Sequence, residues 1–305
     1  MTTPNNSQMI SSETWFIPID ILSIICLSLT ILLAFLFLLI IIHDKTCHTI
    51  PMMLIGNSCV AELFLSSVIL WMTKFTLQND LTQNINPDSF CIYRGYIVYV
   101  GYCAQNYSYL LQAIYRYIVV IHPTRVFWQS KRVQILLISL VWITAILYAF
   151  PHLFTGEIVY IADDQTCQMS LRLSAVSVYN LFYSYVIPIQ GIIFIYLKLV
   201  RYVKEMSKRV MPANLLSRAQ RELRMVFRIM ILISTLLALG IPYATFILMG
   251  YFTQPPEHSF RIAYVFVCIS LLIIILILFN GTDPVRLSLM KQINRRPNTV
   301  IAGRT

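Results

Sequence analysis

Two carboxylates, Glu62 and Asp283, lie within long apolar stretches of this 305-residue chain. A charge in an apolar interior is costly, and two nearby carboxylates stay ionised together only with a bound cation or a shared proton. The pair therefore predicts an ion or proton site, with Asn57, Gln105 and Asn280 as neutral partners. Two other interpretations remain open: a hydrogen-bonded packing cluster, and the coupling site of a proton- or ion-coupled membrane transporter.

Membrane-spanning helices must position these side chains. A bilayer core of ~30 Å needs about 20 mostly apolar helical residues. The chain has seven such stretches: Ile17–Ile42, Met52–Met72, Ile92–Ile114, Val133–Phe154, Ala175–Val200, Val226–Phe252 and Ile262–Phe279. Runs such as Ile31–Ile42 are apolar on all sides, which favours helices over the alternating strands of a barrel. The predicted fold is an all-α bundle of seven transmembrane helices.

Composition excludes several classes of protein. Hydrophobic residues make up 58% of the chain and charged residues 12%, whereas a soluble domain carries about 25% charged residues. No internal repeat is visible, which weakens the transporter interpretation because transporters commonly have repeated halves. The sequence has no nucleotide-binding glycine loop, no metal-spaced His/Cys cluster and no nucleophile elbow, so no enzymatic activity is predicted.

The net charge of +10 is distributed unevenly between the loops. Basic residues follow the third, fifth and seventh stretches and precede the sixth, all on one side of the membrane. The positive-inside rule places that side in the cytoplasm and the N-terminus outside. Asn5, in the sequon Asn5-Asn6-Ser7, is then a candidate glycosylation site. This placement of charge argues for a lipid bilayer and against nucleic acid as the partner.

Under this topology, only two of the seven cysteines, Cys91 and Cys167, lie on the outer side. In an oxidising compartment they are able to form a disulfide. The bond would hold an outer loop against the top of the third stretch. Two free thiols in loops are the alternative.

Several landmarks follow one another along the stretches. They are Cys91, Tyr115-Arg116-Tyr117, Trp142, Pro188, Tyr196, Glu222, Pro242 and Asp283-Pro284. In this order and spacing they resemble the rhodopsin-like (class A) G-protein-coupled receptors, over nearly the whole chain. The resemblance implies a plasma-membrane receptor that transmits binding of an extracellular ligand to heterotrimeric G proteins. It also implies an outer tail over residues 1–16, a receptor domain over 17–284, and an amphipathic helix with a cytoplasmic tail over 285–305.

The resemblance implies that Arg116 pairs with Glu222 in the inactive state and then moves toward Tyr196 and the G protein. The same switch includes Tyr115, Tyr117, Pro242, Asp283 and Pro284. A plain membrane anchor is the alternative role for Arg116, because an arginine at a helix end extends to the interface. The chain departs from the family where Tyr115 replaces an acidic residue, Gly240 a tryptophan and Leu287 a tyrosine.

The resemblance also places Glu62 and Asp283 face to face, where the family binds a sodium ion; no other cofactor is implied. It predicts a ligand cavity lined by Val98, Tyr99, Tyr102, Asn180, Ser184, Tyr243 and Ile273. Val98 stands where amine receptors carry an aspartate, and Ile277 stands where opsins carry the retinal lysine. A neutral small molecule or a peptide is therefore the predicted ligand.

Overall fold

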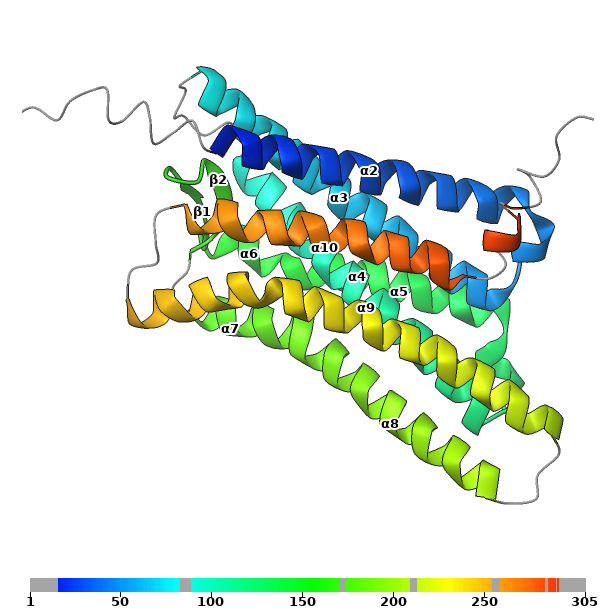
Figure 1. Ribbon diagram of the computed structural model, residues 1–305. Helices are drawn as coiled ribbons and strands as arrows, with labels where there is room; N and C mark the ends of the chain where they lie inside the picture. Colours follow the sequence, from blue (N-terminus) through cyan, green and yellow to red (C-terminus); the bar gives the residue numbers. More distant parts are fainter. Residues whose placement is uncertain are drawn as a thin grey trace, which may run out of the picture.

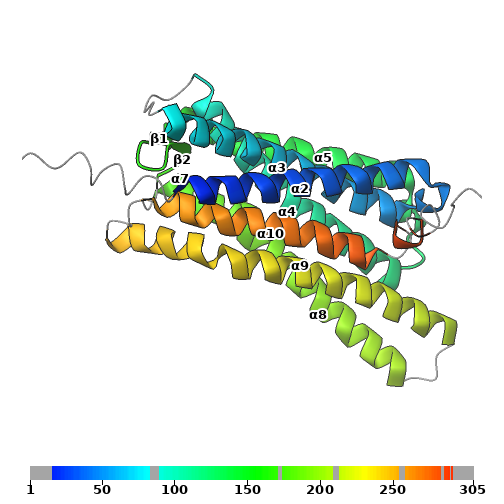
Figure 2. The same ribbon diagram turned by 45° about the horizontal axis from the view of Figure 1, so that its top comes forward.

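The structure is a computed structural model that describes residues 16–82, 89–170, 174–208, 213–253, 258–282, 285–288 and 290. Within these residues, seven long helical segments run side by side in one bundle (Figure 1, Figure 2). They are α2 (Phe16–His43), α3 (Ile50–Thr82), α4 (Cys91–Ile121), α5 (Lys131–Ala149) with α6 (Pro151–Phe154), α7 (Ala175–Leu181) with α8 (Ile187–Lys208), α9 (Ala213–Phe252) and α10 (Ser259–Gly281). The predicted seven-helix bundle is confirmed.

Short elements connect the long helices. They are the 3₁₀ turns η1 (Lys45–Cys47) and η2 (Val126–Gln129), the π-helical turn η3 (Phe182–Val186) between α7 and α8, and the strands β1 (Ile158–Ile161) and β2 (Thr166–Met169). Ser130 caps α5 by accepting a hydrogen bond from the backbone N–H of Val133, and Ser174 caps α7 in the same way from Ser177. Such caps satisfy N–H groups that have no partner within the helix.

Six of the described long segments are sufficiently long and apolar to cross a membrane. The seventh, α4, is long but less apolar than the others. The reason lies in its position in the bundle. α4 packs against α3, α5, α8 and α9, so its polar side chains face other helices instead of lipid. Buried polar residues on α4 include Gln105, Asn106, Ser108 and Gln112.

Apolar side chains cover the outside of the bundle as well as its core. Leu32 is 62% exposed, Leu136 60% and Phe194 59%. A soluble protein rarely exposes so many large apolar residues together, whereas a bilayer accepts them. In the core, Phe37 of α2, Tyr109 of α4 and other buried side chains form one continuous cluster. The five free cysteines are buried within the helices and turns.

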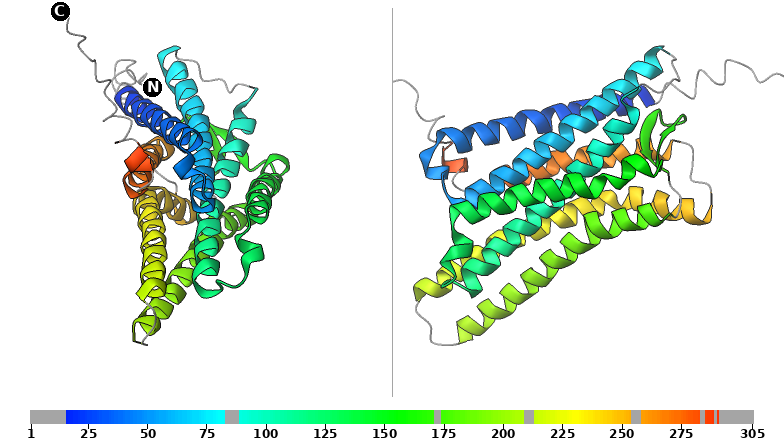
Figure 3. Two further views of the ribbon diagram at one scale, coloured as in Figure 1. Left: turned by 90° about the vertical axis from the view of Figure 1, so that its right-hand side faces the viewer. Right: turned by 180° about the vertical axis from the view of Figure 1, so that it is seen from behind.

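The two ends of the bundle differ. At one end, termed the hairpin end, β1 and β2 pair antiparallel, with Ile158 opposite Met169 (Figure 1). The sequence analysis predicted only a loop here. At the opposite end, termed the basic end, α8 stops at Lys208 and α9 begins at Ala213 (Figure 3). Beyond α10, residues 285–288 and 290 are helical, while the rest of the predicted amphipathic helix and Asn5 lie outside the described residues.

Candidate functional site

At the hairpin end, a disulfide joins Cys91, the first residue of α4, to Cys167 of β2, with a Cα–Cα distance of 5.4 Å. The predicted pairing is confirmed. Gly95, one turn further along α4, brings the hairpin closer still. A Cβ atom there would lie 2.9 Å from the carbonyl oxygen of Cys167 and 2.8 Å from Ile158. The hairpin is therefore held against α4 by a covalent bond and by direct backbone packing.

Beneath the hairpin lies a group of tyrosines, termed the tyrosine cluster: Tyr99, Tyr102, Tyr185, Tyr243 and Tyr264. Gln168 of β2 connects two of them. Its side chain accepts a hydrogen bond from the Tyr99 hydroxyl at 3.0 Å and donates one to the Tyr264 hydroxyl. The cluster thus provides neutral hydrogen-bonding groups directly beneath the hairpin.

The other residues predicted to line a ligand cavity are placed differently. Val98 is fully buried in a packed cluster with Leu65 and Leu271. Asn180 accepts a hydrogen bond from the Tyr148 hydroxyl of α5. Ser184 is buried in η3, and Ile273 is half-buried on α10. The structure therefore brings Tyr99, Tyr102 and Tyr243 together and sets Val98 and Asn180 against neighbouring helices.

Arg261 of α10 organises the hairpin end. Its guanidinium forms a bidentate pair with Asp80 of α3, at 2.5 and 2.9 Å, and lies 3.6 Å from a carboxylate oxygen of Asp20 in α2. The backbone N–H of Arg261 donates to Asp164, at 3.1 Å, in the turn between the strands. Burial raises the pKa of the Asp164 carboxyl, against the opposing effect of this hydrogen bond. One arginine therefore connects α2, α3, α10 and the hairpin.

In the middle of the bundle, Glu62 is completely buried. Its Oε2 atom accepts hydrogen bonds from Gln105 and, at 3.5 Å, from the Tyr109 hydroxyl. Its Oε1 atom has no hydrogen-bond partner among the described residues. Glu62 and Gln105 are thus in contact as predicted, whereas Asp283 and Pro284 lie outside the described residues.

The prediction that Asn280 joins this pair was wrong. Asn280 is exposed near the end of α10, because that helix turns Ile274, Ile275 and Leu278 toward the bundle instead. Asn57 also points elsewhere: it donates to Ser108 at 2.8 Å and accepts from the Trp142 indole at 3.0 Å.

The sequence analysis missed further members of this polar contact between α3 and α4. Ser58 accepts a hydrogen bond from Gln112 at 2.5 Å, and Tyr109 reaches Glu62. A signal was present in the sequence. Gln105, Ser108 and Gln112 recur at steps of three and four residues, which places them on one face of a helix.

At the basic end, Arg116 of α4 and Glu222 of α9 form an ion pair with an N–O distance of 3.0 Å. Their side chains are only 3% and 12% exposed. The same Arg116 nitrogen lies 2.8 Å from the sulfur of Met225, and its Nε atom has no partner among the described residues. The predicted contact between these two side chains is present, and it connects the central helix to the start of α9.

The neighbours of this pair are packed. Tyr115 is buried in a cluster with Leu54 and Val119. The Tyr117 ring meets His122 edge-on, and the Tyr196 ring lies 6.3 Å from Phe227. Pro242 stands inside α9.

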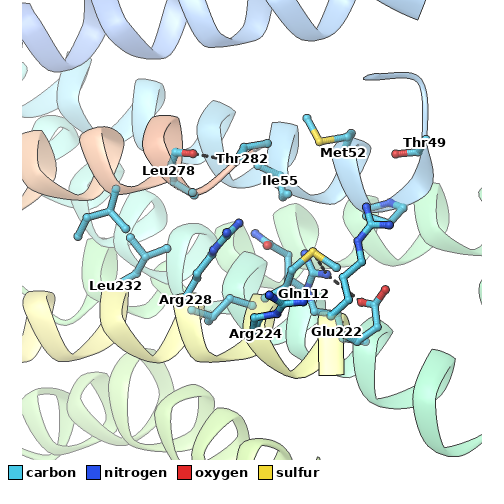
Figure 4. Close-up of a pocket in the computed structure, with 17 residues that line it drawn as sticks. Thr49, Met52, Ile55, Gln112, Glu222, Arg224, Arg228, Leu232, Leu278 and Thr282 are labelled. Atoms are coloured by element: carbon cyan, nitrogen blue, oxygen red, sulfur yellow. Dashed lines mark hydrogen bonds and ion pairs between the residues drawn. The ribbon is translucent and has the colours of Figure 1, made fainter. Parts of the chain in front are cut away.

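A cavity of about 440 Å³ opens beside the ion pair. It lies between the first turns of α3, the last turns of α4 and α10, and α9 (Figure 4). Arg116, Arg221, Arg224 and Arg228 line it, together with Glu222 and an apolar wall that includes Met52, Ile55 and Leu232. The cavity is large enough for a side-chain cluster or a small ligand.

Residues 34–280 match the 7 transmembrane receptor (rhodopsin family). The chain belongs to this family. It is 27% identical to a blue-sensitive opsin from Conger conger over 220 residues, which cover 69% of the chain and 61% of that opsin. It is 26% identical to a rhodopsin from Scyliorhinus canicula over 226 residues, covering 71% of the chain and 62% of that rhodopsin. The chain thus matches less than two thirds of the length of these curated relatives.

The fold agrees with family membership. The crystal structure of squid rhodopsin superimposes with a TM-score of 0.76 at 18% identity, covering 92% of this chain and 86% of the squid protein. Rhodopsin-family membership makes the protein a multi-pass membrane protein of a receptor class, and the comparisons give no support to the transporter alternative.

Proposed function

We propose that the protein is a plasma-membrane receptor, with its N-terminus outside, that transmits binding of an extracellular ligand to heterotrimeric G proteins. The Arg116–Glu222 ion pair carries this proposal. It closes α4 against α9 beside the cavity of the basic end, and the positive-inside rule assigns that end to the cytoplasm. Separation of the two helices would admit a G-protein segment to the same space.

The proposed ligand is a neutral small molecule or a peptide bound at the tyrosine cluster. Tyr99 and Tyr264 already hold Gln168 of the hairpin by hydrogen bonds, so a ligand that replaced these bonds would shift the hairpin relative to α4 and α10. Light sensing of the kind suggested by the opsin relatives is not proposed. Ile277 stands where opsins carry the retinal lysine, and an isoleucine has no amine for a Schiff base.

Glu62 is the proposed centre of a sodium or proton site, with Asp283 as its partner by position in the family. Complete burial of Glu62 and the absence of a described partner for Oε1 support this assignment. A carboxyl group in such a place either pairs with a cation while ionised or carries a proton and is neutral.

The function can be tested by screening neutral compounds and peptides on cells that express the chain with G-protein dissociation sensors. We expect a hit that dissociates a G protein in expressing cells only. Substitution of Tyr102 by alanine should weaken the response, whereas alanine at the lipid-facing Leu136 should not. Coupled uptake of substrate into sealed vesicles, without G-protein dissociation, would instead support a transporter.

A further inference from the structure

Among the described residues that line the cavity of the basic end, positive charge exceeds negative charge. Four arginines line it, and Glu222 is the only carboxylate among the described lining residues. Glu222 is already paired with Arg116. Among the described residues, Arg221, Arg224 and Arg228 form no ion pair. Three cationic side chains therefore face one cavity with no ion-pair partner among the described residues.

These three arginines share one face of α9. Positions 221, 224 and 228 are separated by three and four residues, the spacing that aligns side chains along a helix. Like charges at this spacing repel each other. A bound anion that contacted all three would remove that repulsion, and a guanidinium matches a phosphate with two parallel hydrogen bonds.

The position of Arg228 indicates a formed site instead of a mobile surface charge. Gly281 of α10 leaves room for it: a Cβ atom at that glycine would lie 3.3 Å from Cδ of Arg228 and 3.9 Å from its Nη1 atom. Figure 4 shows Arg228 extending from α9 across the cavity toward Ile55 and Thr282. Arg228 therefore lines the cavity as a half-buried side chain that packs against Gly281 of α10.

We propose that this cavity binds a phosphate-bearing anion through Arg228, Arg224 and Arg221. The anion is either the headgroup of an inner-leaflet phosphoinositide or a free phosphate compound of the cytoplasm, since both offer the same chemistry. A bound anion that kept Arg228 packed on Gly281 would hold α9 against α10 and so favour the closed arrangement of the Arg116–Glu222 pair. This consequence rests on the proposed function, whereas the binding itself does not.

Binding is therefore tested without any G protein. The full chain is placed in phosphatidylcholine nanodiscs, and binding of soluble inositol trisphosphate is followed by calorimetry and by the rise in Tm. A second sample contains phosphatidylinositol bisphosphate in the nanodisc. We expect at least one probe to raise Tm. Binding of the soluble probe assigns a free anion, and a response to the lipid alone assigns a headgroup.

The variants Arg228→Gln and Arg224→Gln should weaken binding by about tenfold or more, because each loses a charged two-point contact with phosphate. Arg201→Gln is the matched control. Arg201 is exposed at the same end on α8 and does not line the cavity. If Arg228→Gln does not fold, the exposed Arg224 still provides the test. Absence of binding by both probes, or equal weakening in the Arg201 variant, would overturn the proposal.

Discussion

Substitution of Glu222 by glutamine should raise signalling in the absence of ligand. Glutamine keeps the size of the side chain but removes the charge that faces Arg116 at 3.0 Å. The guanidinium, 3% exposed, would then be buried without its counter-charge, which costs about 3–5 kcal/mol in a protein interior. Because Glu222 is partly exposed, the lower part of this range applies.

That penalty falls on the closed state alone if activation separates α4 from α9. Coupling energies in such switches are about 1–3 kcal/mol, which changes an equilibrium by about 5- to 150-fold. A receptor with roughly 1% of its molecules active would rise to roughly 5–60% active, by the same range of factors.

The assay compares basal G-protein dissociation at equal surface expression. Glu205→Gln is the control, since Glu205 is an exposed carboxylate at the same end on α8. Basal signalling in the Glu222 variant equal to that of wild type and of the control would refute the switch. Arg116 would then be a membrane anchor.

Four further outcomes are expected. Cys167→Ser should lower stability by about 2–5 kcal/mol and reduce surface expression; peptide mapping that finds both cysteine thiols free in the folded wild type would contradict this. Arg261→Gln leaves the carboxylates of Asp20 and Asp80 without the guanidinium, so it should lower stability by about 3 kcal/mol or more and lower the Tm in detergent far more than the exposed Lys74→Gln variant does. Burial raises the pKa of the Asp164 carboxyl in the folded chain, so the folded chain loses stability as pH rises from the unfolded pKa of about 3.9 through the raised folded pKa. Asp164→Asn should remove this loss. A variant with a lower Tm than wild type at neutral pH would contradict this prediction. Glu62→Gln should abolish any dependence of agonist affinity on sodium or pH, and an unchanged dependence would leave Glu62 as a packing residue.

Hydropathy predicted the seven spans because a bilayer demands long apolar helices whatever they pack against. It could not locate their ends. α3 continues to Thr82 and α9 begins at Ala213, since helices extend past the lipid wherever no breaker stops them. The hairpin was missed because its strands are only four residues long and depend on packing against Gly95 and the disulfide.

At the candidate site, the landmark residues shared with the family predicted contacts between their own side chains. The Arg116–Glu222 and Cys91–Cys167 contacts are examples. It failed where the rotation of a helix decides which side chain faces inward, as with Asn280, which is exposed, and Asn57, which turns to α5. The excess of arginine over carboxylate among the described residues of the basic-end cavity was visible only when α4, α9 and α10 were assembled.

Guanine-nucleotide exchange on a purified heterotrimeric G protein tests the receptor assignment most directly. The chain, its Glu222→Gln variant and empty nanodiscs are each mixed with a panel of such G proteins. We predict that the variant accelerates exchange on at least one of them above the rate with empty nanodiscs, and that adding Arg116→Ala returns the rate to that background. Exchange at the background rate for every G protein, by a chain that is folded and carries the Cys91–Cys167 disulfide, would contradict the account.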